Sequence, residues 1–264
     1  MTNPEILKEE LKSPEYFELL HRHEVMWRSL GIFLSFCKMN FSRAGDIAVR
    51  HFFLRVLDDF LQSVVAINYL CREGIHHTCR RELRYLLELS VKACLISQKS
   101  EASELEFEEQ IEEHKKILKK SEFNLINSIQ FKLFTEQSAE EFKRDVKRMY
   151  GVLSAYSHST PFQVSERLGR ENAGKAIGYE GTEELRDLNE HAQLTYSYIA
   201  TLLAHALEEW VLGDFLVESN GERNPWHFRK SKYIAMLDER FDYKHERQEN
   251  LQRIKSDRLA DIEF

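Results

Sequence analysis

The chain has 264 residues, a mass of 31.3 kDa and a formal net charge of −7, which is enough material for one large domain or two small ones. Hydrophobic residues make up 42% and charged residues 31%, with only 4 prolines and 10 glycines. This balance excludes a collagen-like, low-complexity or wholly disordered chain. The negative charge argues against a broad cationic face for duplex nucleic acid, although a local basic pocket needs only a few arginines or lysines.

The sequence also bears on the compartment. No run of about 18 or more apolar residues is free of charge, so no membrane-spanning segment is predicted. Residues 1–11 are acidic and lack the apolar stretch of a signal peptide. The four cysteines show no Cys-x-x-Cys spacing, which favours a reduced, cytoplasmic protein without disulfides. They are Cys37, Cys71, Cys79 and Cys94.

The first helix is predicted from Pro14 to about Phe41. Ser13 is a residue type favoured at the N-cap, and proline is well tolerated at the first helical position. Apolar residues recur at helical spacing through this stretch.

The next two helices are predicted over residues 46–71 and 75–98. Asp46 is expected to cap the first of them and Gly74 to end it. Because both are apolar around much of their circumference, we expect them at the centre of the fold. A further helix over residues 101–120 carries glutamates first and lysines later, which suits the helix dipole and a peripheral position.

The second half begins with a helix over 139–153, for which Ser138 is the expected N-cap. Residues 158–181 hold Pro161 and four glycines and are predicted to be the only long irregular segment. A loop of this length in a helical domain is usually functional or disordered. The longest helix is then predicted over 182–219 and ends at Asn220-Gly221.

The last part of the chain, residues 222–264, carries many charges of both signs and few apolar residues after Tyr243. We interpret it as a short helix followed by a charged helical extension that could dock a protein partner. No strand-like alternation and no internal repeat is visible. The prediction is therefore an all-α fold, with a helical bundle over 1–221 and a C-terminal charged extension over 222–264.

Specific enzyme and metal motifs are missing. The chain has no glycine-rich phosphate loop, no Gly-x-Ser-x-Gly elbow and no His-Glu-x-x-His. The groups His21-Arg22-His23 and His76-His77-x-Cys79 are weak metal candidates, because adjacent residues on a helix point about 100° apart, so such histidines cannot easily share one ion. We expect no metal and no cofactor.

One group of chemistry-bearing residues joins two helices. Arg84 and Glu88 are four residues apart on the third helix and so share a face, where both charges are expected to be semi-buried and paired. Ser154 and His158 are likewise four apart, at a helix end that opens into the irregular segment. Converging helices would bring Arg84 near His158, either as a site or as a structural polar cluster.

A second group lies at the start of the predicted last long helix. Arg186 and His191 are five residues apart, on neighbouring faces of its first turns. This pair is either a functional arginine and histidine or part of a solvated first turn.

These residues carry a family resemblance. Leu83 to Glu88 (LRYLLE) and Tyr150 to His158 (YGVLSAYSH) resemble motifs of uncharacterised bacterial helical proteins that look distantly like the HEPN superfamily of helical bundles. The resemblance covers about residues 46–215. Arg186 to His191 matches the HEPN signature of an arginine followed four to six residues later by a histidine. The stronger motif match instead selects His158, so the two histidines are alternatives for the active-site residue.

The resemblance implies a metal-independent endoribonuclease of a toxin or anti-phage defence system that acts on single-stranded RNA. A histidine would move the proton of a ribose 2′-hydroxyl and an arginine would hold the phosphate. Arg84, His158, Arg186 and His191 are then the catalytic candidates. Glu88, Ser154 and Tyr156 are the candidates for substrate binding. Such enzymes usually work as homodimers.

Two other functions are open. The chain could be a non-catalytic interaction subunit whose Arg84 cluster is structural, or a sensor with a ligand pocket under the irregular segment. Catalysis requires arginine and histidine side chains within about 6 Å of each other around a solvent-reachable, phosphate-sized cavity. The interaction subunit predicts them buried or scattered.

Overall fold

The structure is a computed structural model of the chain. It describes residues 8–42, 51–118, 122–157, 160–173, 175 and 180–264. Apart from one isolated bridge between Val217 and Arg223, the regular elements among these residues are all helical, which confirms the predicted all-α class. None of the described helices is long and apolar enough to cross a membrane.

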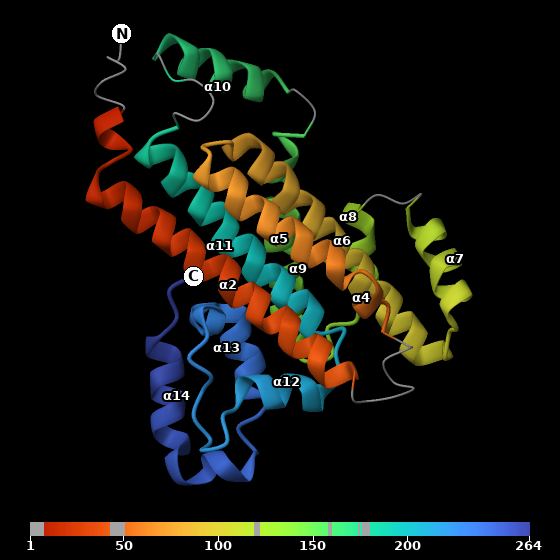
Figure 1. The fold of residues 1–264 in the computed structure, drawn as a ribbon. Helices are drawn as coiled ribbons and strands as arrows, with labels where there is room; N and C mark the ends of the chain where they lie inside the picture. Colours follow the sequence, from red (N-terminus) through yellow and green to blue (C-terminus); the bar gives the residue numbers. More distant parts are fainter. Residues whose placement is uncertain (1–7, 43–50, 119–121, 158–159, 174, 176–179) are drawn as a thin grey trace.

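Four long helices lie side by side and form the body of the molecule (Figure 1). They are α2 (Pro14–Ser42), α5 (Leu57–Arg72), α6 (His76–Ser103) and α11 (Thr182–Ala204). Helix α11 packs against α6 and α2, and α5 packs against the same two helices. Helix α6 is buried along much of its length, as predicted for residues 75–98. The prediction of a central position for residues 46–71 is wrong, because α5 keeps an exposed side, and α11 is the second helix that is largely buried.

The remaining elements surround this body. They are α4 (Phe52–Arg55), α7 (Phe107–Ile117), α8 (Glu122–Leu125), α9 (Glu136–Ser154), α10 (Pro161–Asn172), α12 (Glu209–Leu216), α13 (Lys232–Glu239) and α14 (Leu251–Ala260), with short 3₁₀ turns at Ile126–Ser128, His227–Lys230 and His245–Asn250. Helix α9 packs against α6 and α11. Helix α10 covers one end of the body, and α12 to α14 lie at the other (Figure 1).

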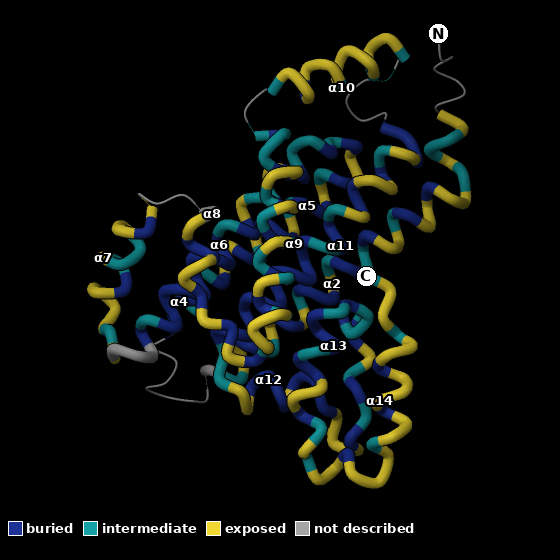
Figure 2. Tube along the Cα trace, turned by 180° about the vertical axis from the view of Figure 1, so that it is seen from behind, coloured by how far each residue is buried: buried dark blue, intermediate teal, exposed yellow. Residues whose placement is uncertain are grey.

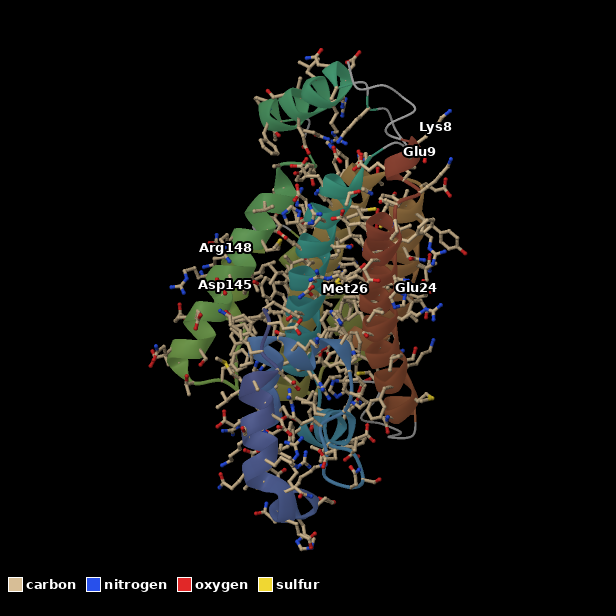
Figure 3. All side chains as sticks on the ribbon, turned by 90° about the vertical axis from the view of Figure 1, so that its left-hand side faces the viewer. Lys8, Glu9, Glu24, Met26, Asp145 and Arg148 are labelled. Atoms are coloured by element: carbon tan, nitrogen blue, oxygen red, sulfur yellow. The ribbon has the colours of Figure 1, made fainter. Side chains whose placement is uncertain are left out.

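Burial follows the helical period along α2, where buried and exposed positions alternate (Figure 2). Met26 is completely buried, whereas Glu24, two residues earlier, lies toward the outside and forms ion pairs with Arg28 and Arg72 (Figure 3). Residues two apart on a helix point in different directions, so one can face the core while the other faces water.

Several predicted helix ends are confirmed. The Oγ of Ser13 accepts a hydrogen bond from the backbone N–H of Tyr16 at 3.1 Å, so Ser13 caps α2 as expected. Gly74 has φ +64°, a backbone conformation that glycine adopts without strain, and the chain leaves α5 there.

The predicted helix over residues 46–71 is interrupted. Asp46 lies outside the described residues, and Val56 separates α4 from α5. Helix α6 runs past the expected end at Gln98 to Ser103, and Glu104 then turns the chain at φ +50°. The peripheral helix consequently begins only at Phe107.

Two predictions in the second half are wrong. The N-cap of α9 is Thr135, whose Oγ1 accepts from the backbone N–H of Ser138, so Ser138 is already inside the helix. The segment 158–181, predicted to be irregular, contains helix α10. Its N-cap is Thr160, which accepts from the N–H of Gln163, and Pro161 occupies the first turn.

The last long helix is shorter than predicted. Helix α11 ends at Ala204 and α12 begins at Glu209, so residues 182–219 do not form one helix, and α2 with 29 residues is longer than α11 with 23. A distant side chain supplies the reason for the break. The Nε2 of Gln98 donates to the carbonyl of His205 at 3.0 Å and thereby satisfies a backbone acceptor at the end of α11.

The segment 222–264 is attached to the body by aromatic packing. The indole N–H of Trp226 donates to the carbonyl of Ser29 at 2.7 Å, and its ring contacts Phe33 and Phe215. The turn before it requires glycine. A Cβ on Gly221, at φ +80°, would lie 2.0 Å from a backbone carbonyl oxygen.

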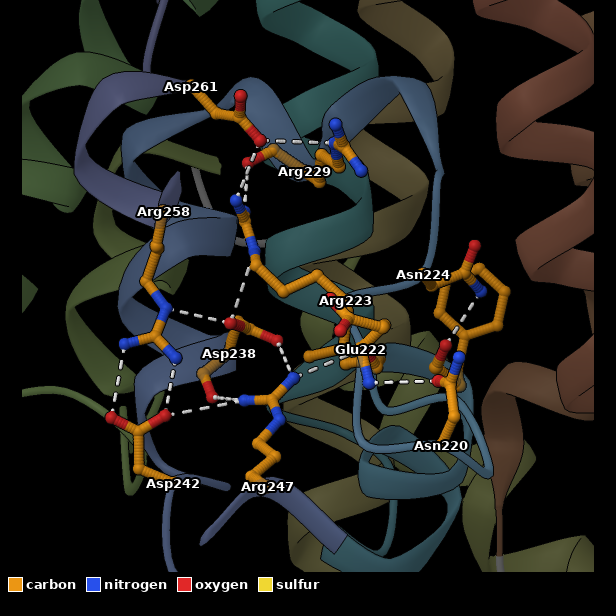
Figure 4. A network of polar contacts seen from close by, with 12 residues as sticks. Asn220, Glu222, Arg223, Asn224, Arg229, Asp238, Asp242, Arg247, Arg258 and Asp261 are labelled. Atoms are coloured by element: carbon orange, nitrogen blue, oxygen red, sulfur yellow. Dashed lines mark hydrogen bonds and ion pairs between the residues drawn. The ribbon is translucent and has the colours of Figure 1, made fainter. Parts of the chain in front are cut away.

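The charges of this segment form an internal network, which we call the C-terminal arginine network (Figure 4). The carboxylate of Asp238, only 2% exposed, accepts ion pairs from Arg247 at 2.6 Å, Arg258 at 2.7 Å and Arg223 at 3.3 Å. Asp242 and Asp261 lie beside the same arginines, so each buried guanidinium of the network has a carboxylate partner. They are paired as Asp242 with Arg247 and Arg258, and Asp261 with Arg223.

Candidate functional site

The described members of the first predicted group, Arg84, Glu88 and Ser154, lie together where α6 meets α9. The Nε of Arg84 lies 2.9 Å from Oε1 of Glu88, and a terminal nitrogen donates to the hydroxyl of Tyr150 at 2.8 Å. The side chains of Arg84 and Glu88 are 17% and 19% exposed, the semi-buried state that the helical spacing predicts. The Oγ of Ser154 donates to the carbonyl of Tyr150 at 2.6 Å. The group therefore ties α6 to α9.

The two members of the second group have different partners. Arg186 is exposed and forms an ion pair with Glu15 of α2. His191 instead accepts a hydrogen bond at Nδ1 from the Nε of Arg80 on α6, at 3.3 Å. His158 lies outside the described residues. The arginine that the structure brings to a candidate histidine is thus Arg80, which the sequence motifs did not select.

Arg80 connects His191 to a further imidazole through Tyr156. Its guanidinium carbon lies 4.7 Å from the centre of the Tyr156 ring, a cation–π arrangement. On the same ring, His77 makes an edge contact with its centroid 5.2 Å away. Four side chains from α6, α11 and the end of α9 therefore form a continuous cluster of imidazole, phenol and guanidinium groups.

A cavity of about 750 Å³ lies beside this cluster, between the start of α6 and helix α10. The residues that line it are mostly of polar or charged types: Gly74, Ile75, His76, His77, Thr78, Arg81, Tyr156, Ser157, Gln163, Arg167, Arg170, Glu171, Lys175 and Glu180. We call it the α6–α10 cavity. Its size is within the range of small-molecule sites, about 300–1,000 Å³.

Two of the four cations that line the cavity have a carboxylate partner. Arg170 forms ion pairs with Glu180 and, at 3.6 Å, with Glu166, and Lys175 pairs with Glu184. The exposed Arg81 and Arg167 have no carboxylate within ion-pair distance among the described residues.

Arg80 is the exception among the buried arginines. It is 3% exposed, and its recorded partners are the neutral groups His191 and Tyr156, with no carboxylate of the described chain in ion-pair distance. A buried charge is costly unless it is paired. Arg80 does not line the cavity itself, but it places a positive charge without a carboxylate partner directly behind Tyr156, which does.

The histidines of the cluster are neutral at pH 7. Burial, followed by the charges of Arg170 and Arg80, lowers the pKa of His77 to about 3. Burial and Arg80 lower the pKa of His191 to about 4. With the Gln163 amide as donor to Nδ1 of His77 at 3.1 Å, the imidazole proton is on Nε2, which faces the carboxylate of Glu166 at 3.6 Å.

The weak metal candidates of the sequence bind separate partners. Nδ1 of His76 lies 2.7 Å from Glu180, His77 contacts Gln163, and the Sγ of Cys79 faces the carbonyl of Ile67. Among the described residues no three histidine, cysteine, aspartate or glutamate side chains are placed to hold a metal ion.

The sequence contained a signal for the residues that were missed. Thr160-Pro161 repeats the pattern of Ser13-Pro14, an N-cap type followed by proline, and so indicates a helix start within the segment predicted to be irregular. Once α10 is a helix, the spacing of Gln163, Glu166 and Arg170 puts these polar side chains on one face.

Searches of family models, of curated proteins and of solved structures found no match to this chain.

Proposed function

We propose that this protein is a HEPN-like, metal-independent ribonuclease that binds single-stranded RNA in the α6–α10 cavity. The observation that carries the proposal is the charge of Arg80, buried against the cavity wall without a carboxylate partner. A phosphodiester in the cavity would supply the missing negative charge. Guanidinium groups are also well suited to phosphate oxygens, which they bind through charge-assisted hydrogen bonds.

The arginines and the histidine near the cavity have different roles in binding the phosphate. Arg81 and Arg167 line the cavity and have no carboxylate to release, so they bind the phosphate oxygens. Arg80 adds positive charge through the Tyr156 ring and does not need to touch the ligand. His191 is a positioning residue, because it accepts from Arg80 and holds its guanidinium over that ring.

His77 is the histidine of the cavity wall that does the chemistry. The Gln163 amide leaves Nδ1, the unprotonated nitrogen, and Nδ1 then takes the proton of the ribose 2′-hydroxyl while the 2′-oxygen attacks the phosphorus. The bond from phosphorus to the 5′-oxygen breaks, and the imidazolium returns the proton to that oxygen. The products are a 2′,3′-cyclic phosphate and a 5′-hydroxyl. Burial is the largest cause of the lowered pKa of His77, and Arg170 and Arg80 follow it. The charge of the phosphate offsets these two arginines, so RNA binding raises the pKa of His77 and makes it a stronger base.

The geometry of the cavity favours a single strand. A volume of about 750 Å³ under α10 holds one or two nucleotides but not both strands of an RNA helix. Phe162, 57% exposed beside Tyr156, offers a ring on which an unpaired base can stack. A cytoplasmic homodimer in a toxin or defence system belongs to the same proposal, since the family resemblance implies it.

The test is RNA cleavage by the purified full-length chain in EDTA. Wild type is expected to leave 2′,3′-cyclic phosphate ends. His77→Asn is expected to slow cleavage by about 100-fold or more, the usual contribution of an acid–base group. His21→Asn on the exposed surface of α2 is the matched control and is expected to be neutral.

Other variants separate the candidates. His191→Asn is expected to slow cleavage less than His77→Asn, because it acts through Arg80. Loss of cleavage in His158→Ala alone would contradict the α6–α10 cavity as the site. A folded wild type that neither cleaves nor binds RNA would contradict the ribonuclease.

That last outcome would favour the second candidate function, a non-catalytic subunit that binds a protein partner. The observation in its favour is the surface of the 222–264 segment, where Tyr243 is 72% and Leu259 is 73% exposed. Large exposed apolar side chains often mark contact surfaces when they are contiguous.

A further inference from the structure

Helix α10 packs with its polar side toward the body. Gln163 is buried, Glu166 and Arg170 are half-buried, and all three lie on one face. The large apolar residues Phe162 and Leu168 are exposed, and Figure 2 shows most of α10 coloured as exposed. This orientation is the reverse of an ordinary surface helix, whose apolar stripe faces the core.

The attachment of α10 therefore depends mainly on polar contacts. Gln163 and Glu166 both contact His77, and Arg170 pairs with Glu180. The main apolar contact recorded is the edge of Phe162 against Tyr156, with ring centres 6.0 Å apart. The hydrogen bond and the ion pairs of Glu166 each contribute little net stability, whereas the Arg170–Glu180 pair, with side chains 16% and 7% exposed, is the contact that costs most to break. Because Gln163 is the one residue of α10 that is buried, detaching α10 still costs less than detaching a helix of the body.

We propose that α10 is a lid over the α6–α10 cavity and that the ion pair between Arg170 and Glu180 is its latch. Opening separates α10 from the start of α6 and exposes His77 to solvent. Closing returns Arg167, which α10 carries, to the cavity. The lid itself follows from the contacts of α10 alone, whereas its role in admitting RNA rests on the proposed function.

Hydrogen–deuterium exchange of the free, full-length protein tests the lid without any ligand. Amides of residues 164–172 are expected to exchange faster than those of residues 190–200 in α11. Glu180→Gln removes the charge of the latch but keeps an acceptor near His76, and is expected to speed exchange in α10 by about five- to tenfold without changing α11.

The matched control is Glu171→Gln. Glu171 also lines the cavity, but it forms no ion pair with any described residue, so its neutralisation is expected to leave α10 exchange unchanged. Arg170→Gln is expected to behave like Glu180→Gln, and Arg170→Lys, which keeps the cation, to stay close to wild type. Equal exchange in Glu180→Gln and Glu171→Gln would overturn the latch. Exchange in wild-type α10 as slow as in α11 would overturn the lid.

A second measurement separates the lid from the ribonuclease. A 5′-fluorescein-labelled single-stranded RNA is mixed with each variant in EDTA, and the association rate is followed. If the lid admits RNA, Glu180→Gln raises this rate several-fold and bound RNA slows exchange in α10. Fast exchange that responds to Glu180→Gln, together with no RNA binding, would keep the lid and refute the proposed function. RNA binding at one rate in both glutamate variants would refute the role of the lid in admission.

Discussion

Two arginine clusters at opposite ends of this protein differ in one respect. In the C-terminal arginine network, Arg223, Arg247 and Arg258 each bind a buried aspartate. At the α6–α10 cavity, Arg80 is equally buried but contacts only a neutral imidazole and a phenol ring. The first cluster is electrically complete by itself and holds helices together, while the second is complete only when an anion is added.

The largest loss of stability is expected in the C-terminal arginine network. Asp238→Ala leaves three buried guanidinium groups without their main partner, so we expect the free energy of unfolding to fall by about 3–5 kcal/mol. Urea denaturation followed by circular dichroism measures it. Asp257→Ala on exposed α14 is the control, and equal losses in the two variants would show that the network is not structural.

Removing the charge of Arg80 at the α6–α10 cavity is expected to have the opposite effect on stability. Arg80→Met removes a buried charge that lacks a carboxylate, so stability should stay within about 1 kcal/mol of wild type or rise. Binding of a single-stranded RNA, measured by fluorescence anisotropy, should weaken by about tenfold or more. A large loss of stability with RNA binding unchanged would make Arg80 a structural residue.

A pH effect separates the clusters further. The pKa of His191 is lowered from 6.5 to about 4 in the folded protein, so the unfolded chain binds the proton first as pH falls. The contribution of His191 to stability is therefore complete above about pH 6.5, declines toward pH 4, and is constant below that. His191→Asn should recover about 1 kcal/mol of the stability lost between pH 7 and pH 5, measured by urea denaturation at both values. No difference between variant and wild type would mean that His191 is not held neutral by its surroundings.

The smallest effect is expected at Arg186, the arginine that matches the HEPN signature in the sequence. Arg186→Gln removes an exposed ion pair with Glu15, which should cost less than about 0.5 kcal/mol and change RNA cleavage by less than about threefold. Thermal denaturation and the EDTA cleavage assay measure these two quantities. Loss of cleavage in this variant would instead place the active site at the Arg186–His191 pair.

The parts of the fold that were predictable depend on neighbours in sequence. Ser13 caps α2 through a bond to the N–H three residues later, and Gly74 ends α5 through its own backbone. Thr160 could have been recognised in the same way, but the surrounding glycines favoured a loop. The end of α11 could not, because it depends on Gln98, which is 107 residues away from His205.

The contacts of the candidate site were likewise predictable only between residues that are close in sequence. Arg84 and Glu88 form the pair that their four-residue spacing predicts. The partner of His191 is 111 residues away, and the cavity exists only because α10 covers the start of α6. Residue types therefore indicated arginine and histidine chemistry, but not which arginine meets which histidine.

The order of polar and apolar residues by itself determined that the chain is all-α, that α6 lies at its centre, and where several helices begin and end. These properties follow from hydrogen bonds and periodicity within a few residues. Only the tertiary structure decided that Arg223, Arg247 and Arg258 are neutralised by aspartates and that Arg80 is not. Coulomb energy depends on which charges are brought close in space, and that is set by packing between helices distant in sequence.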